Sequence, residues 1–196
     1  DNVVRSNNHP NFSQKGIVVN MVPPGSGMLV MATTEIQVER NEIRDNRTFG
    51  IAAANSNITQ RDPQDSTYNR YPTAVEIAEN TFAVADTVPS DQSRPLGQMI
   101  SQIHEKMGAQ LDILFDGDLN PELVTEAGGY EGPNRVCIRG NTAEDGSVDF
   151  FNMAQPQQAL KAHDCTHKDL PKVELPFTPG ADDLQAPESK ATASAH

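Results

Sequence analysis

The sequence predicts a mainly β protein: a right-handed parallel β-helix solenoid with one inserted α-helix and an irregular C-terminal tail. Two observations support this fold class. Residues 36–43 contain two alternating apolar positions, a polar pair, an Asn and one more apolar position, and the pattern returns at 75–82 and, more weakly, at 136–143. A glycine-led apolar strand at 27–30 is followed 23 residues later by another at 50–55, which is close to one β-helix coil.

The repeated stretch is interpreted as one rung of the solenoid. Residues i and i+2 of a strand share a face, so Ile36 and Val38 are expected to point inward together. Asn41 then occupies a bend, where Asn tolerates unusual backbone angles, and Ile43 turns inward again. Stacked Asn amides can donate and accept along the stack. The alternative, three unrelated hairpin strands that end in Asn turns, leaves the shared positions unexplained.

The chain before this rung is expected to contain part of an earlier one. Val4 and Asn7 are assigned the places of Val38 and Asn41. A short strand is predicted over 16–20, and the Pro and Gly residues at 23–27 end it. The small residues at 52–54 indicate a tight column or a bulky neighbour.

Residues 59–73 form a polar insertion, and a helix is predicted near 93–108. Insertions in solenoids usually leave from one face, often the binding face. Ser93 is a typical N-cap, Pro95 suits the first turn, and Gly108 ends the helix. Apolar residues recur on one helical face: Met99, Ile100, Ile103 and Met107.

One domain is expected over 1–177, and a disordered tail over 178–196, where Leu184 is the only large apolar residue. The chain has two cysteines, Cys137 and Cys165, which are predicted to form a disulfide that ties the C-terminal extension to the last rung. The alternative is that both are reduced and unrelated.

The net charge of −12 argues against nucleic-acid binding, because phosphate contacts need basic surface. Acidic polysaccharides are repelled too, unless a basic groove or bound calcium intervenes. No run of about 18 apolar residues exists, so no membrane span is predicted.

The chain resembles a family of bacterial secreted proteins, the parallel β-helix domain-containing proteins, which are related at fold level to the pectate-lyase-like superfamily. The resemblance is carried by Asn8-His9-Pro10-Asn11-Phe12, Val22-Pro23-Pro24-Gly25-Ser26-Gly27, Val38-Glu39-Arg40-Asn41, Phe115-Asp116-Gly117, Val136-Cys137-Ile138 and His163-Asp164-Cys165. It implies a periplasmic or extracellular location and a longer mature protein of which this chain is the C-terminal half. It implies little about chemistry.

The candidate catalytic residues lie in the polar insertion. Asp62-Pro63-Gln64-Asp65 is similar to the Asp-Pro-His-Asp motif of alginate C5-epimerases, but Gln64 cannot take a proton as the His would. The resemblance implies that Asp62 and Asp65 act as a base or bind calcium, the one cofactor suggested.

Further residues of the insertion complete this site. Arg61 and Arg70 would neutralise a substrate carboxylate, and Tyr68 and Tyr71 are the candidate substrate-binding residues. The alternative is a solvated Asp-Pro turn without chemistry.

No metal site is predicted. A run of oxygen ligands over 116–122 begins like a calcium loop, but Pro121 and Ala127 stand where an EF-hand requires Gly and Glu, so a capped turn is preferred. His163, Cys165 and His167 share one side of an extended strand, but a bridged Cys165 cannot be a ligand. Surface histidines beside a disulfide are the preferred interpretation.

Two functions are compatible with these features. The first is a secreted β-helix domain that recognises an extracellular polysaccharide and processes it as a lyase or epimerase would. The second is a non-catalytic scaffold at the cell surface, whose partner is another surface protein. The sequence does not decide whether the protein is an enzyme, since fold does not fix function.

Overall fold

A computed structural model describes residues 1–59, 65, 67–83, 95–125 and 131–170. In these residues the chain forms three sheets, in which each strand pairing is parallel. Sheet A contains β1 (Val3–Arg5), β4 (Glu42–Arg44), β7 (Thr81–Ala83) and β10 (Thr142–Ala143). Sheet B contains β2 (Ser26–Met31), β5 (Phe49–Ala54), β8 (Ile113–Phe115) and β11 (Phe150–Asn152). Sheet C contains β3 (Thr34–Glu39), β6 (Thr73–Ala78) and β9 (Cys137–Arg139).

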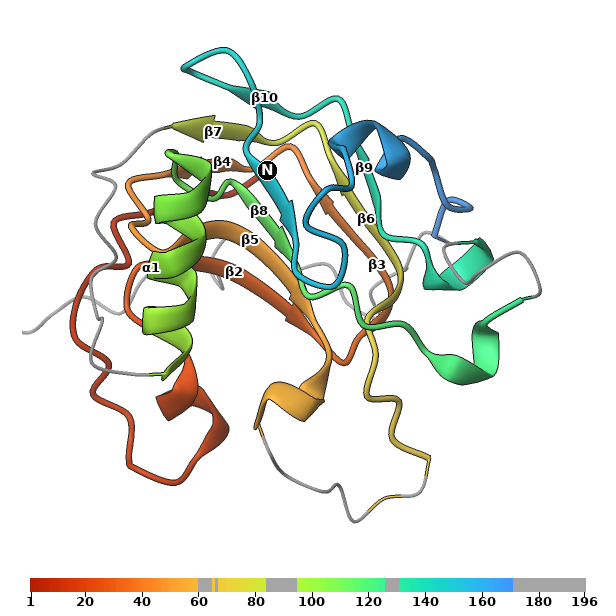
Figure 1. Cartoon of the computed structure of the whole chain (residues 1–196), viewed down its shortest axis with the longest axis horizontal. Helices are drawn as coiled ribbons and strands as arrows, with labels where there is room; N and C mark the ends of the chain where they lie inside the picture. The colour runs from red at the N-terminus through yellow and green to blue at the C-terminus, as the bar shows by residue number, and fades with distance from the viewer. Residues whose placement is uncertain (60–64, 66, 84–94, 126–130, 171–196) are drawn as a thin grey trace, which may run out of the picture.

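Successive strands join sheets A, B and C in rotation, so each strand pairs with the third strand after it (Figure 1). The described chain also has one α-helix, α1 (Pro95–Met107), which lies over the outer face of sheet B (Figure 1). Short 3-10 helices occupy the connections: η1 (Val18–Met21), η2 (Ser56–Thr59), η3 (Pro121–Leu123), η4 (Gly132–Asn134) and η5 (Leu160–His163). The fold is therefore mainly β, with parallel sheets, and it is compatible with a β-helix-like arrangement.

The register confirms the predicted rungs. Ile36 pairs with Val75 and Val38 pairs with Ile77, and Ile77 pairs in turn with Ile138. Across the next corner Ile43 pairs with Phe82. The glycine-led strands also stack as predicted, since residues 28–31 pair with residues 51–54 at an offset of 23.

The inward positions of all three sheets meet in one apolar core. Its buried members lie in successive strands or, for Val136, directly before one: Val30, Val38, Ile43, Ile51, Ala53, Val75, Ile77, Phe82, Ile113, Phe115, Val136 and Ile138. Each apolar inward residue stacks on an apolar residue of the next strand, which buries a continuous column of side chains. This burial is the main source of stability in a layered parallel fold.

An asparagine ladder runs along the corner between sheets C and A. Asn2 Nδ2 donates to Asn41 Oδ1 at 3.0 Å, Asn41 Nδ2 to Asn80 Oδ1 at 2.9 Å, and Asn80 Nδ2 to Asn141 Oδ1 at 3.0 Å. Each acceptor oxygen also receives the backbone N–H of the Asn that donates to it. Asn80 Nδ2 further donates to the Val38 carbonyl at 2.8 Å. The predicted stacking of Asn amides is therefore confirmed.

The predicted backbone role of these Asn residues is wrong. The left-handed conformation belongs to the preceding residue in each rung: Arg40 (φ 54°), Glu79 (φ 55°) and Gly140 (φ 62°). The left-handed residue turns the chain, and the Asn after it satisfies the backbone groups that the turn leaves without strand partners. Asn is thus selected here for its amide.

The first rung is displaced from its predicted position by five residues. Val4 pairs with Ile43 and not with the Val38 row, and Asn2 takes the place of Asn41. Asn7 belongs instead to the row of Asn46, whose Oδ1 accepts its backbone N–H at 3.2 Å. The spacing of Val4 and Asn7 imitates a rung, which explains the misassignment.

The inserted helix is confirmed, and the short strand predicted at 16–20 is wrong. α1 buries Ile100 and Ile103 against sheet B, and Gly108 ends it with φ 69°. Residues 18–21 form the 3-10 helix η1 instead of a strand, and the Asn11 amide donates to the carbonyls of Val19 and Val22.

The segment after β11 covers the outer face of sheet C. The Cys137–Cys165 disulfide confirms the predicted tie to the last rung. His163, expected on the surface, is buried: its ring packs on Phe115 and Phe150, and its Nδ1 lies 2.9 Å from the Val136 carbonyl oxygen. Burial lowers the His163 pKa. The boundary predicted between 1–177 and 178–196 lies outside the described residues.

The ladder predicts a strong position dependence of stability. Asn80→Ala leaves the Asn41 N–H and the Val38 carbonyl buried without their partners and should lower the free energy of unfolding by about 3 kcal/mol. Asn2→Ala, in the same row but exposed, should cost less than about 1 kcal/mol. Urea unfolding measures both; equal losses would contradict a role for buried amides.

The disulfide predicts a second effect. Replacing Cys137 and Cys165 together by Ala should lower the free energy of unfolding by about 3–4 kcal/mol, because the unfolded chain gains the freedom of the closed loop. Dithiothreitol should lower the thermal unfolding midpoint of the natural chain and leave that of the double variant unchanged. An equal shift in both would show that the reductant acts elsewhere.

Candidate functional site

The structure describes only part of the predicted catalytic loop. Arg61 and Asp62 lie outside the described residues. Asp65 is exposed, and its Oδ1 accepts hydrogen bonds from the Thr67 N–H at 2.8 Å and the Thr67 hydroxyl at 2.7 Å. These bonds lower the Asp65 pKa. They are the bonds of a local turn, which is the alternative that the sequence left open.

Of the other predicted loop residues, Arg70 fastens the loop to η2, directly after β5. Arg70 Nη1 donates to Asn57 Oδ1 at 2.9 Å, and the Arg70 carbonyl accepts the Ser56 N–H at 2.8 Å. Tyr68 is exposed, and Tyr71 is half-buried with its N–H bound to the Asn69 side chain. These contacts place the described part of the loop at the corner between sheets B and C.

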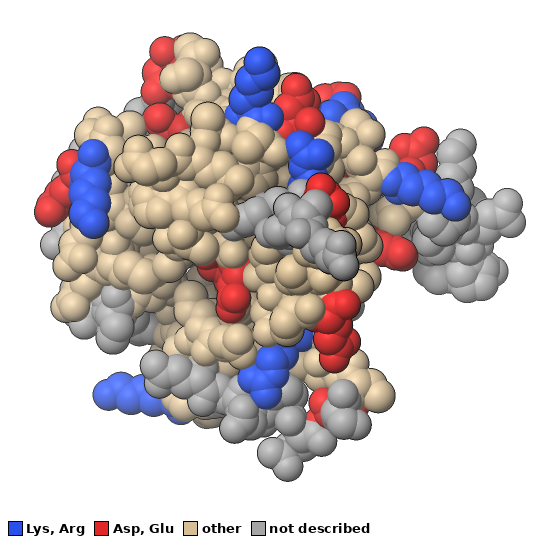
Figure 2. Space-filling model, turned by 45° about the vertical axis from the view of Figure 1, so that its right-hand side comes forward, with Lys and Arg blue, Asp and Glu red and all other residues tan. Residues whose placement is uncertain are grey.

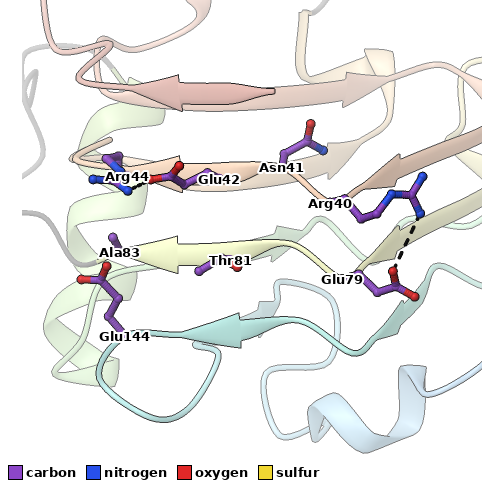
Figure 3. A pocket seen from close by; sticks show the side chains of 8 residues that line it. All are labelled: Arg40, Asn41, Glu42, Arg44, Glu79, Thr81, Ala83 and Glu144. Carbon is purple, nitrogen blue, oxygen red and sulfur yellow. Dashed lines mark ion pairs between the residues drawn. The ribbon is translucent and has the colours of Figure 1, made fainter. Parts of the chain in front are cut away.

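A polar groove lies elsewhere, over the outer face of sheet A. Its volume is about 410 Å³. Figure 3 shows its lining on β4, β7, the corner before these strands and the residue just after β10: Arg40, Asn41, Glu42, Arg44, Glu79, Thr81, Ala83 and Glu144. None of the loop residues that the structure describes is among them. Sequence reasoning missed this groove, although the alternation of apolar Ile43 with polar Glu42 and Arg44 marks one open face.

The outward positions that line the groove stack in register from strand to strand. Glu42 pairs in register with Thr81 and Thr81 with Thr142, while Arg44 pairs with Ala83. Neighbouring parallel strands lie about 4.8 Å apart, so the row of Glu42, Thr81 and Thr142 presents polar groups at that interval, whereas Ala83 interrupts the row of Arg44. Parallel, in-register pairing therefore brings polar residues from distant parts of the sequence into one row on the surface.

The charges of the groove are matched within it. Arg40 Nη1 lies 2.8 Å from Glu39 Oε2 and 3.8 Å from Glu79 Oε2, and Arg44 pairs with Glu42 (Figure 3). Among the lining residues two arginines face three glutamates. The surface around the molecule is mixed in the same way, since Figure 2 shows acidic and basic side chains interspersed on the face that it displays.

Such a surface is suited to hydrogen bonding. Guanidinium groups offer several donors in a fixed plane, carboxylates offer acceptors, and the Thr81 hydroxyl can do both. A hydroxyl-rich ligand can therefore be bound at several points without a net charge of its own.

Carboxylates with a raised pKa lie outside the groove. Burial raises the pKa of Asp112 to about 7, assisted by the nearby Asp149 and Asp145, although Asp112 Oδ2 accepts the Asp149 N–H at 2.9 Å. Burial also raises the pKa of Asp116 to about 6. Both residues flank β8 on sheet B, away from the groove.

The stretch that began like a calcium loop is a pair of turns. Asp116 accepts the N–H groups of Asn55 at 2.6 Å and Asp118 at 3.1 Å, and Asn120 caps η3 by accepting the Glu122 N–H at 3.0 Å. The predicted capped turn is confirmed. In the residues that the structure covers, no cluster of three or more His, Cys, Asp or Glu side chains has a metal-binding arrangement.

Comparison with protein-family models, with curated protein sequences and with solved structures finds no match to this chain. Among the helices within the described ranges, none has both the length and the apolar character to cross a membrane.

Asp112 predicts a pH dependence of stability. The folded chain holds a proton on Asp112 up to about pH 7, whereas the unfolded chain releases it near pH 3.8, so this group lowers stability as pH rises between these values. Asp112→Asn keeps an acceptor for the Asp149 N–H and should be more stable than the natural chain by about 2 kcal/mol at pH 8 after allowance for solvent screening, with no gain at pH 3.

Asp65→Asn provides a control of opposite sign for this measurement. The pKa of Asp65 is lowered in the folded chain, so its ionised carboxylate adds to stability above pH 3.8. This contribution is lost on acidification. This variant should therefore be less stable than the natural chain at neutral pH and equal to it in acid. Urea unfolding at several pH values measures both variants; a gain for Asp112→Asn that is the same at pH 3 and pH 8 would contradict the assignment.

Proposed function

We propose that this chain is a secreted right-handed parallel β-helix domain that recognises an extracellular polysaccharide through the groove over sheet A. The observation that carries the proposal is the row of polar residues Glu42, Thr81 and Thr142, which stack in register on successive parallel strands at this groove. A polysaccharide also repeats a hydroxyl-bearing unit at regular intervals, so a periodic row of donors and acceptors matches its chemistry. The wider relation to pectate-lyase-like proteins is part of the proposal.

The charge of the groove indicates which kind of polysaccharide it would bind. Two arginines against three glutamates give the groove no excess of positive charge, and the whole chain carries −12. A polyuronate would meet net repulsion unless a cation came with it. The preferred ligand is therefore a neutral polysaccharide.

Processing of the polysaccharide is a further part of the proposal. A lyase or epimerase would act on uronates, with calcium balancing the substrate's charge, and the loop at 59–73 would supply Asp62, Asp65, Arg61 and Arg70. The described part of this loop lies at the corner between sheets B and C, and the groove lies over sheet A. Recognition is therefore proposed ahead of processing.

A periplasmic or extracellular location is proposed with the same reasoning. Disulfides persist in oxidising compartments, and Cys137 and Cys165 are joined.

The alternative is a non-catalytic scaffold at the cell surface that binds another protein. One observation favours it: Arg40 and Arg44 already pair with glutamates of their own surface. Such pairs hold a charged face in place without a ligand, although exposed pairs contribute little to stability.

Binding to the groove can be tested by affinity electrophoresis in gels that contain a neutral β-glucan, a galactomannan or sodium polygalacturonate. The natural chain should be retarded by a neutral polymer. Replacing Arg40 and Arg44 together by Ala should weaken that binding at least tenfold, because it removes both planar donors. Lys161→Ala, at an exposed position of η5, should leave binding unchanged.

Two results would decide against the proposal. Retardation that is equal for the natural chain and both variants would remove the groove from the binding site, and no retardation by any neutral polymer would favour the scaffold. The lyase version is tested separately, by the absorbance of unsaturated products from alginate and polygalacturonate with and without calcium.

A further inference from the structure

A second hollow of the molecule is mainly apolar and lies over the outer face of sheet B, away from the groove on sheet A. Its volume is about 720 Å³, within the range of small-molecule sites. Its walls are the outer face of sheet B, the start of α1, η1 with its flanking residues, and η2. Well-packed interiors leave few voids larger than a water molecule, so an apolar hollow of this size requires an explanation.

Strand register explains how the hollow arises. On the outer face of sheet B, Met31 pairs with Ala54, which is followed in the same row by Asp116. In the next row Leu29 pairs with Ala52 and Ala52 with Leu114. In these two rows β5 therefore carries only the methyl groups of Ala52 and Ala54, beneath the start of α1. The small residues at 52–54 were expected to accompany a tight column or a bulky neighbour; Ala53 faces the core, and Ala52 and Ala54 leave space outside it.

The apolar wall is flexible and partly open. Four methionines line it, at positions 21, 31, 99 and 153, and methionine side chains adapt their shape to a ligand. At its rim Met21 and Leu29 are each 38% exposed, which is unusual for large apolar residues that could have packed together. Exposed apolar surface gathered around a cavity is typical of a binding site.

One acidic residue gives the hollow its polar end. Asp116 lines the hollow, and its carboxylate accepts the N–H groups of Asn55 and Asp118. An ionised carboxylate has about four acceptor positions, so about two remain for a ligand. Most of the lining is apolar, with Lys15, Asn20 and Thr59 as its other polar members, and burial raises the Asp116 pKa to about 6, which indicates that water solvates this carboxylate poorly.

We propose that this hollow binds a small amphiphile with an apolar body and a hydrogen-bond-donor head, a hydroxyl or an ammonium group, and that Asp116 accepts from that head. The body fits between Ala54 and the methionines, where apolar burial supplies the affinity. The head satisfies the free acceptor positions of Asp116. An anionic head would face the Asp116 carboxylate and is excluded by repulsion. This site is independent of the groove on sheet A.

The test uses N-phenyl-1-naphthylamine, an apolar dye with an N–H donor, as the probe. Its fluorescence should rise with one saturable site per folded chain. 1-Decanol and decylamine should displace it, and decanoate should do so at least tenfold more weakly at pH 8. Non-saturable binding would overturn the site, and equally effective displacement by decanoate would overturn the role of Asp116.

Substitutions in the lining of the hollow test where the dye binds. Ala54→Phe fills the hollow and should weaken dye binding at least tenfold. Leu29→Phe, at a partly exposed lining position that tolerates a larger side chain, provides a second filling variant if circular dichroism shows that the first does not fold. Leu123→Phe, on exposed η3 outside the hollow, is the matched control and should bind as the natural chain does. Unchanged affinity in a folded filling variant would place the dye elsewhere and overturn the proposal.

Discussion

Backbone pairing between each strand and the third strand after it determines where every other group of this protein lies. Once Ile36 is paired with Val75, the inward column, the left-handed corner at Glu79 and the amide of Asn80 all have fixed positions. The corner is the vulnerable part of such a rung, because backbone groups there leave the sheet and must find other partners. The buried asparagines provide them, and for this reason polar residues lie inside a layer that is otherwise apolar.

The same strand pairing limits which surfaces of the protein can bind a ligand. Inward positions are used by the core, so only outward faces can meet a ligand. The C-terminal segment covers the outer side of sheet C at β6 and β9, where Glu76 is buried against Arg139 and the backbone of His167. α1 covers much of sheet B and leaves the apolar hollow at one end. Sheet A keeps its face open to solvent, with Thr81 and Thr142 exposed.

How far the sequence predicts this structure depends on which face of a strand a residue occupies. Inward residues obey a simple alternation, so the rungs at 36–43, 75–82 and 136–143 were correctly aligned. Val4 and Asn7 were misplaced because their spacing imitates a rung, and only partners 39 residues away reveal the true register. The groove and the hollow were not predicted, since outward residues become neighbours only through stacking. Ala52 and Ala54 give no signal of a cavity until Asp116 and α1 are placed beside them.

The offset between stacked partners varies widely although the stacking does not. It is 23 residues between β2 and β5, 39 between β3 and β6, and 61 between β6 and β9. Length changes should therefore be distributed very unevenly along the gene. A codon gained or lost within a rung shifts every later side chain of that strand to the opposite face, whereas one between rungs only alters a loop. New binding specificities can accumulate in the connections, while the layers that carry them keep their register.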